Sequence, residues 1–264
     1  EGGLHPRKGT KDPFTRMAKG FGLGRTTGLD LPGEADGRIA DRAWKRAYWK
    51  ATRDFYCRKA KTGYPEVRRT DPARATFLRQ LSRENCVDGW AYRGGDAANF
   101  AIGQGDTLVT PLQLATAYGA LENDGKECVP HVLDRVVAPD ETVVRDYQQN
   151  CRKHVRIDDK YLTYVRDALT GTMTGSGTAA AAFAGFPFND VWVAGKTGTA
   201  EVPPKQDYSW FAAMTAAGGQ EHVVVVMVEQ GGHGATTAAP IARHIIEGLY
   251  GLDFSQFGDV AGTD

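Results

Sequence analysis

The residues best suited to do chemistry lie in the stretch VWVAGKTGTAE, which runs from Val191 to Glu201. Lys196 places an amine beside the hydroxyls of Thr197 and Thr199, and the intervening Gly198 has no side chain. On an extended strand, such an amine would assist proton transfer and the two hydroxyls would hold an anionic group. The bare Gly198 would let an extended substrate lie close against the strand and pair with its backbone.

The same stretch contains Gly-Lys-Thr, which closes a phosphate-binding loop in many proteins. That loop needs a glycine five positions before Gly195, but Asp190 occupies the position, and its carboxylate would repel a phosphate. The loop should also follow a strand and open a helix. Here Val191–Val193 runs straight into the motif, and EVPPKQD, with two prolines, follows it. The sequence context therefore argues against a phosphate-binding loop.

The composition limits the classes of partner. The chain has 264 residues, 41% of them hydrophobic, which suffices for one large domain or two small ones. Lysine plus arginine equals aspartate plus glutamate at 32 each, so we expect no nucleic-acid partner for the whole chain. The longest apolar run, at 222–228, is far shorter than the ~20 residues that a membrane helix needs.

Four cysteines allow three disulfide pairings, and none of them forms Cys-x-x-Cys or has a histidine at zinc-ligand spacing, so we expect no metal and no cofactor. Between Cys128 and Cys151, two β-rich runs flank a turn at 138–141, which would bring these two cysteines together and leave Cys57 to pair with Cys86. The alternative is four buried free thiols, as in a cytosolic protein. We favour two disulfides, which imply an oxidising, extracytoplasmic environment.

Residues 38–93 differ in character from the rest of the chain, with 15 lysines and arginines against 6 acids and several tryptophans and tyrosines. A helix is predicted at 71–85, with Phe77, Leu78 and Leu81 on one apolar face. We interpret the segment as a solvated, disulfide-pinned insertion. A nucleic-acid surface, or a surface attracted to an anionic cell-wall polymer or lipid headgroup, is the alternative.

The remaining pattern indicates an α+β fold rather than a doubly wound one, because helices come first, adjacent strands follow, and a last helix ends the series. One helix should begin with a capping box formed by Thr110 and Gln113. Strands separated by short polar connections predict an antiparallel meander. The helices are expected at 12–20, 110–125, 159–173, about 175–186 and 237–251, and the strands at 191–201, 208–216 and 222–230.

Several motifs resemble those of class B penicillin-binding proteins. A Lys-Thr-Gly strand belongs to the serine acyl-transfer site of penicillin-binding proteins and class A β-lactamases, and SWFAA follows it here as in that family. FGLGRTTGLDLPGE, IGQGDTLVTPLQLATAYGAL and GGHGATTAAPIAR are similar to other family segments and occur in the family's order. The IGQG…VTPLQLA sequence looks more like that of the elongation-type protein, penicillin-binding protein 2, than that of the septal type. The resemblance covers nearly the whole chain except 38–93. It implies the penicillin-binding protein/β-lactamase-like transpeptidase fold, an antiparallel sheet with flanking helices.

The sequence departs from the family in lacking the other two motifs of the site, Ser-x-x-Lys and Ser-x-Asn. None of Ser82, Ser176, Ser209 and Ser255 begins either motif. The family places both motifs upstream of the FGLG segment, which starts here at residue 21. We therefore expect residues 1–264 to be a partial transpeptidase domain that lacks its N-terminal part, with the nucleophilic serine in an upstream segment.

The resemblance implies a peptidoglycan D,D-transpeptidase that cross-links stem peptides by serine acyl transfer during cell-wall elongation and is a target of β-lactams. It assigns Lys196 to the proton relay, and Thr197, Gly198 and Thr199 to the substrate. The backbone N–H of Thr199 would form half of the oxyanion hole. It also implies a cell-wall glycosyltransferase as partner, and a place on the extracytoplasmic face of the bacterial membrane, anchored by an N-terminal segment. The alternatives are a D,D-carboxypeptidase or β-lactamase-type hydrolase, and a non-catalytic cell-wall or β-lactam-sensing module.

Four further residues are weaker candidates for the site. His233 lies in GGHG, where the family pattern favours a structural or rim role over a general base. Gln104 lies in a glycine-rich turn and is expected to be structural. Asp207 and Tyr208 precede the second predicted strand, and we expect them to line the cleft.

Overall fold

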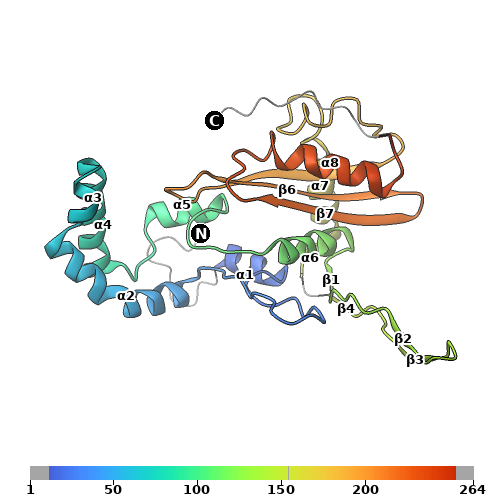
Figure 1. Ribbon diagram of the computed structural model, residues 1–264, viewed down its shortest axis with the longest axis horizontal. Helices are drawn as coiled ribbons and strands as arrows, with labels where there is room; N and C mark the ends of the chain where they lie inside the picture. The colour runs from blue at the N-terminus through green and yellow to red at the C-terminus, as the bar shows by residue number, and fades with distance from the viewer. Residues whose placement is uncertain (1–11, 154, 254–264) are drawn as a thin grey trace. The chain divides into compact units, whose positions relative to one another are not determined.

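The computed structural model describes residues 12–153 and 155–253, and these fall into two compact units. The first unit contains residues 12–16 and 39–107 of the described chain, and the second contains residues 17–38 and 108–253. Figure 1 shows that the first is built from helices and that the second contains the sheets. The helices and strands together confirm the α+β class.

The sheet of the second unit is the antiparallel meander that the sequence predicts. It consists of β5 (Trp192–Ala200), β6 (Tyr208–Ala217) and β7 (Gln220–Val228), paired in that order. Side chains alternate between the two faces of a strand. Two helices, α6 (Pro111–Glu122) and α8 (Ala238–Leu249), pack on the sheet, and Figure 1 shows them on opposite sides of it.

The main core lies on the α8 side of the sheet. Phe211 of β6 and Ile246 of α8 are both fully buried there, and the ring of Phe183 stacks on Phe211 with centroids 5.6 Å apart. The prediction of a short helix at about 175–186 is wrong, because the segment folds as successive turns. The buried side chain of Arg243 donates to the carbonyls at positions 182 and 184 (2.9 and 2.8 Å), and these carbonyls are thus bound by a guanidinium rather than by a helical ladder.

Helix α6 begins with the predicted capping box. Thr110 Oγ1 accepts from the Gln113 N–H, and Gln113 Oε1 accepts from the Thr110 N–H, each at 3.1 Å. The buried Gln113 amide also donates to the backbone carbonyls of Arg25 (2.6 Å) and Asp36 (2.8 Å). One side chain therefore caps the helix and fastens the glycine-rich segment 21–37 to it.

The segment between Cys128 and Cys151 is a long hairpin, as predicted. Its base pairs β1 (Lys126–Cys128) with β4 (Cys151–Lys153), and its outer part pairs β2 (Arg135–Val137) with β3 (Val143–Asp146). The two cysteines face each other across the base and form a disulfide. The chain reverses at 138–142, where the Ala138 N–H donates to the Thr142 carbonyl at 2.8 Å. Helix α7 (Asp159–Thr170) follows and ends slightly earlier than expected.

In the described part of the first unit, the sequence pattern did not predict α2 (Arg42–Thr62), α3 (Pro65–Arg68) and α5 (Gly94–Ala101), but it did predict α4 (Pro72–Asp88). The helix α1 (Pro13–Gly20) matches the one expected at 12–20. Helix α4 matches the one expected at 71–85, but its predicted apolar face is wrong. Phe77 is 65% exposed and Leu81 is also exposed, whereas Ala75 and Ser82 are buried.

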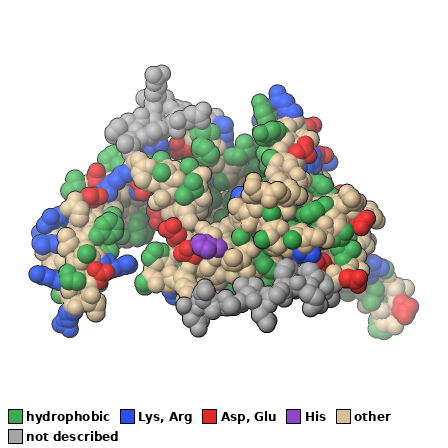
Figure 2. Space-filling model, turned by 90° about the horizontal axis from the view of Figure 1, so that it is seen from above, with side chains coloured by type: hydrophobic (Ala, Val, Ile, Leu, Met, Phe, Trp, Pro, Cys, Tyr) green, Lys and Arg blue, Asp and Glu red, His purple; other side chains and the backbone are tan. Residues whose placement is uncertain are grey.

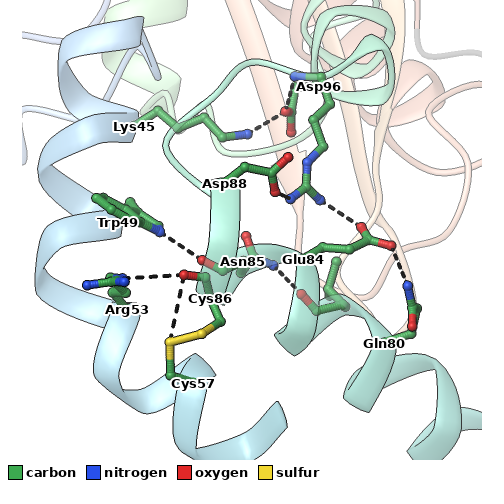
Figure 3. Close-up of polar contacts among 12 residues, drawn as sticks. Lys45, Trp49, Arg53, Cys57, Gln80, Glu84, Asn85, Cys86, Asp88 and Asp96 are labelled. Carbon is green, nitrogen blue, oxygen red and sulfur yellow. Dashed lines mark hydrogen bonds and ion pairs between the residues drawn. A yellow bond between two sulfur atoms is a disulfide. The ribbon is translucent and has the colours of Figure 1, made fainter.

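Helices α2 and α4 lie side by side as a hairpin joined by the Cys57–Cys86 disulfide, which confirms the second predicted pair (Figure 3). Trp49 Nε1 donates to the Asn85 carbonyl at 2.8 Å, and Arg53 Nε donates to the Cys86 carbonyl at 3.3 Å. Side chains of α2 thus bind the last turn of α4 through polar and covalent contacts.

Candidate active site

Lys196, Thr197, Gly198 and Thr199 lie together on β5, as the sequence predicts. Antiparallel pairing aligns Lys196 with Ala212 and Thr199 with Ser209 of β6. Among the described residues, β5 pairs with β6 alone, so it is an edge strand of its sheet. An edge strand presents a row of unpaired backbone N–H and C=O groups, to which an extended peptide binds as an added strand.

The amine and hydroxyls of the motif form one polar cluster. The exposed Lys196 Nζ donates to the carbonyl oxygen of Thr197 (3.0 Å) and to its Oγ1 (3.2 Å). The same Oγ1 lies 2.7 Å from the hydroxyl oxygen of Thr178. Thr178 was not predicted as a site residue, because it lies in the preceding turn segment and nothing in its local pattern marks it. The cluster places a cation and two hydroxyls within reach of one anionic group.

Gly234 allows the loop after β7 to lie directly on the motif. A methyl group on Gly234 would come within 2.3 Å of the Trp210 carbonyl oxygen and 2.5 Å of the Gly198 carbonyl oxygen. A larger residue there would push the loop away from β5, so this close approach needs a glycine at position 234. A methyl group on Gly198 would instead lie 3.1 Å from Trp210 Cβ on the neighbouring strand. Gly234 is a residue whose position the sequence analysis did not single out.

The backbone of the loop 231–237, rather than its histidine ring, makes its contacts with the sheet. Ser209 Oγ donates to the His233 carbonyl (3.0 Å) and accepts from the N–H of Ala238 at the start of α8 (3.0 Å). The Gly232 N–H donates to the Asp207 carbonyl at 3.0 Å. The His233 side chain is exposed, as a rim position would be. The Ser209 hydroxyl both donates and accepts, so its role is structural.

The other predicted site residues differ in their relation to this cluster. Tyr208 pairs with Ala200 at the end of the motif strand, and Asp207 immediately precedes it; both are half-buried. Gln104 lies in the first unit, in a turn after α5 where its backbone N–H donates to the Asn99 carbonyl at 2.8 Å. Within the described ranges, no group of three or more His, Cys, Asp or Glu side chains is arranged to hold a metal ion.

A buried ion pair on α8 contacts the turn segment that precedes β5. Arg243 Nε donates to Glu247 Oε1 at 2.7 Å, with both side chains at least nine-tenths buried. The same guanidinium holds the carbonyls of the turn segment that carries Thr178. Thr178, four residues before the first of these carbonyls, contacts Thr197. The sequence offered only an Arg and a Glu at helical spacing, which is usually a solvated surface pair.

An α+β unit with Lys-Thr-Gly on an edge strand, closed by a glycine-rich loop and a terminal helix, is the arrangement expected of the class that contains penicillin-binding proteins and class A β-lactamases. Residues 6–247 match the sequence profile of the family described as penicillin binding protein transpeptidase domain. The chain belongs to this family.

Known relatives and solved structures agree with this assignment. The chain is 28% identical over 257 residues to the peptidoglycan D,D-transpeptidase MrdA of Salmonella typhimurium, covering 90% of this chain and 34% of the relative. It is 26% identical over 255 residues to MrdA of Haemophilus influenzae, covering 89% and 32%. Among solved structures, Pseudomonas aeruginosa PBP2 has a TM-score of 0.55 at 25% identity, with 94% of this chain and 46% of that one covered. Penicillin binding protein 3 of Mycobacterium tuberculosis has a TM-score of 0.57 at 22% identity, covering 94% and 48%, and shows the same fold. The chain thus spans about a third of the length of the MrdA relatives.

Proposed function

We propose that this chain is the C-terminal part of the transpeptidase domain of a class B, elongation-type penicillin-binding protein. The whole protein would be a serine-type peptidoglycan D,D-transpeptidase that cross-links stem peptides. The observation that carries the proposal is the polar cluster of Lys196, Thr197 and Thr178 on an open sheet edge. The MrdA relatives, which are named peptidoglycan D,D-transpeptidases, support the reaction.

Each residue of the motif has a chemical role in this proposal. The extended stem peptide pairs with the open edge of β5, where Gly198 leaves room for it. Thr197 and Thr199 donate their hydroxyls to the terminal carboxylate, and the Lys196 ammonium adds a positive field beside them. The Thr199 N–H donates to the oxyanion that forms at the attacked carbonyl, and one such donor typically contributes ~3 kcal/mol of transition-state stabilisation.

We propose that the nucleophile comes from outside residues 1–264. Ser-x-x-Lys and Ser-x-Asn do not occur in the chain, and the hydroxyls of Ser82 and Ser209 are buried in hydrogen bonds. We propose that a segment carrying both motifs supplies the serine opposite β5. That serine would attack the penultimate D-Ala carbonyl, D-Ala would leave, and an amine of a neighbouring stem peptide would resolve the acyl-enzyme.

β-Lactams would bind at the same place. The carboxylate of a β-lactam resembles the terminal carboxylate of the stem peptide in charge and would use the same Thr197 and Thr199 hydroxyls. The structural relatives include penicillin binding protein 3 of Mycobacterium tuberculosis complexed with ampicillin. That complex supports β-lactam binding as a property of the fold.

The location and partner follow from the proposed reaction. Two disulfides favour an oxidising compartment, so we place the domain on the extracytoplasmic face of the bacterial membrane, anchored by an N-terminal segment. None of the helices in the described ranges has the length and apolarity that a bilayer crossing requires. Cross-linking consumes new glycan strands, so a cell-wall glycosyltransferase is the partner that would supply them.

Cross-link formation on lipid-linked substrate by the full-length protein tests the function. The Lys196→Ala variant should lower the rate at least ~100-fold, because the proton relay loses its amine. Lys205→Ala is the matched control, since Lys205 is an exposed lysine in the connection that follows β5, and it should keep full activity. The separate chain of residues 1–264 should not be labelled by fluorescent penicillin.

Other products would identify the alternative functions. Release of free D-Ala without cross-links would indicate a carboxypeptidase, and hydrolysis of the β-lactam a β-lactamase. Acylation by penicillin without turnover of stem peptide would indicate a sensing module. Covalent labelling of residues 1–264 alone would show that the missing-serine account is wrong.

A further inference from the structure

The helices α2, α3 and α4 carry positive charge that their own acids do not neutralise. Residues 38–93 contain 15 lysines and arginines and 6 acids. Five of the six acids serve the local structure, as helix caps or as ion-pair partners within the unit. They are Asp41 and Asp71 as caps, Glu66 with Lys59, and Glu84 and Asp88 with Arg93.

Seven exposed cations of this segment have no ion-pair, hydrogen-bond or aromatic-ring partner for their side chains in the described chain: Lys50, Arg58, Lys61, Arg68, Arg69, Arg74 and Arg83. Five of them, Arg58, Lys61, Arg68, Arg69 and Arg74, lie where α2 ends, α3 forms the connection and α4 begins. We call these five residues the basic tip. Figure 2 shows lysine and arginine side chains gathered on the part of the molecule that contains these helices, at the left of the view.

Several contacts hold the backbone under the basic tip in place. Arg79 of α4 donates to the carbonyls of Ala60 (3.0 Å) and Lys61 (3.1 Å) at the end of α2. The Tyr64 hydroxyl lies 2.9 Å from Ser82 Oγ, which ties the connection to α4. The disulfide and the contacts drawn in Figure 3 join the two helices further along the hairpin. The charges therefore lie on a preorganised frame, which lowers the entropy lost when a ligand binds.

The side-chain chemistry of the basic tip favours phosphate. Four of its five residues are arginines, and a guanidinium binds phosphate oxygens through two parallel hydrogen bonds, whereas an ammonium acts as a point charge. A membrane surface fits less well, because a helix that lies on a membrane needs one continuous apolar face. The exposed apolar side chains are divided between the helices, with Phe55 on α2 and Phe77 on α4.

We propose that the basic tip is a binding site for a linear phosphodiester polymer of the cell wall. The arginines are spread around the end of a hairpin, so a flexible chain of phosphates can reach more of them than a flat membrane surface can. The site is separate in sequence and in structural unit from the Lys-Thr-Gly strand, so its phosphate binding is tested apart from catalysis, while the choice of a cell-wall polymer rests on the proposed function. Such a site would hold the enzyme near the polymer without taking part in acyl transfer.

Fluorescence anisotropy with a labelled glycerol-phosphate polymer tests the proposal on the full 264-residue chain. Each phosphate contact releases counterions and adds about 0.7 to the slope of log affinity against log salt, so five contacts give a slope of about 3.5. Affinity should then fall about 100-fold between 50 and 200 mM salt. No binding at 50 mM salt would overturn the proposal.

Charge-reversal variants locate the site. Arg68→Glu/Arg69→Glu should weaken binding at least ~10-fold and lower the salt slope by about 1.4, the share of two contacts. Lys50→Glu/Arg83→Glu makes the same change in net charge at exposed positions away from the tip, and it should weaken binding less than ~3-fold, since a distant exposed charge is screened by salt. Should the reversal disturb folding, Arg68→Gln/Arg69→Gln tests the same contacts without introducing acids.

Three outcomes would overturn the assignment. Equal losses in both double variants would mean that overall charge, not the tip, attracts the polymer. Equal affinity for poly-glutamate would remove the preference for phosphate. Tighter binding to phosphatidylglycerol vesicles than to the polymer would identify a lipid surface instead.

Discussion

Different forces stabilise the inside of each of the two units. In the second unit, apolar side chains from β5, β6, β7, α8 and the turn segment before β5 form one buried cluster. In the first unit, the buried hydrophobic residues among those described are Ile39, Ala40 and Ala75, and α2 has no buried residue at all. Burial of apolar area stabilises the sheet. The α2–α4 hairpin depends on helix caps, polar contacts and a disulfide.

This difference matches what each unit carries. Lys196 and Thr197 lie on β5, and the preceding residue Val193 of the same strand is part of the buried core, so packing fixes the backbone that carries them. The basic tip lies on a hairpin with exposed faces, where its lysine and arginine side chains remain solvated and accessible to a long ligand. The packed sheet suits a reaction that needs fixed side-chain positions, and the solvated α2–α4 hairpin suits binding to an extended polymer.

The largest effect is expected from breaking the buried ion pair of the second unit. Arg243→Leu leaves the Glu247 carboxylate buried without its partner, and removing one partner of such a pair typically costs ~3–5 kcal/mol. It also frees the carbonyls at 182 and 184. Amide hydrogen exchange under mild urea should therefore accelerate in β5 and in the turn segment, while α2 and α4 remain as in the parent chain.

A double variant separates the loss of the pair from the burial of a lone charge. Arg243→Leu/Glu247→Leu removes both charges, so it should lose less stability than the single variant. A single variant within 1 kcal/mol of the parent would contradict the role given to Arg243. Equal acceleration in α2 and α4 would show that the two units do not differ as argued.

The next effect comes from the disulfide of the first unit. Cys57 and Cys86 are 29 residues apart, and closing a loop of that length contributes about 3–4 kcal/mol in the chain-entropy model. Because α2 buries no residue, Cys57→Ser/Cys86→Ser should open the α2–α4 hairpin and leave the sheet intact. Hydrogen exchange should rise in 42–62 and 72–88 and stay unchanged in β5, β6 and β7.

Cys128→Ser/Cys151→Ser is the matched control, since its cysteines are 23 residues apart and the loop entropy is similar. It should loosen only the long hairpin of the second unit. Protection of α2 and α4 that survives loss of the Cys57–Cys86 bond would mean that polar contacts alone hold the first unit.

Much of the second unit could be predicted from the sequence, because its signals are local. The apolar run of 222–228 and the Thr110–Gln113 capping box correctly predicted strand β7 and the start of α6. The helix α2 was missed, because its tryptophans, tyrosines and lysines give no clear apolar stripe. The helix expected at about 175–186 was wrong, because Gly175 and Gly185 adopt positive φ angles (57° and 73°) and the segment folds as successive turns.

The site was predictable only along the strand. Lys196, Thr197, Gly198 and Thr199 share one short motif, and antiparallel pairing places them as expected. Thr178 and Gly234 reach the motif from segments distant in sequence, and a contact of that kind leaves no periodic trace. Their positions follow from tertiary packing, which a local pattern does not encode.

A smaller loss is expected from the side chain that fastens segment 21–37. Gln113→Ala leaves the carbonyls of Arg25 and Asp36 without their donor, and an unpaired buried polar group costs ~1–3 kcal/mol. Hydrogen exchange should rise in 21–37 and at the start of α6. Gln113→Glu keeps the acceptor for the Thr110 N–H but not the amide donor, so it should loosen 21–37 while it spares the cap. An unchanged segment in both variants would contradict the fastening role.

The smallest effect is a loss of protection at acidic pH in the same segment. Burial raises the pKa of Glu34, but hydrogen bonds from the Thr27 and Gly28 N–H groups outweigh it and hold the pKa below the ordinary 4.5. Bonds from Val132 and Leu133 lower the pKa of Asp30 below its ordinary 3.8. A depressed folded-state pKa gives stability that is present above the ordinary value and is lost as pH falls through the folded value. The protection factors in 21–37, which compare each exchange rate with the intrinsic rate at the same pH, should therefore be constant from about pH 8 to 5 and should fall below about pH 4. Glu34→Gln should lower these protection factors at neutral pH and flatten the profile, and an equally steep acid fall in that variant would remove Glu34 as its cause.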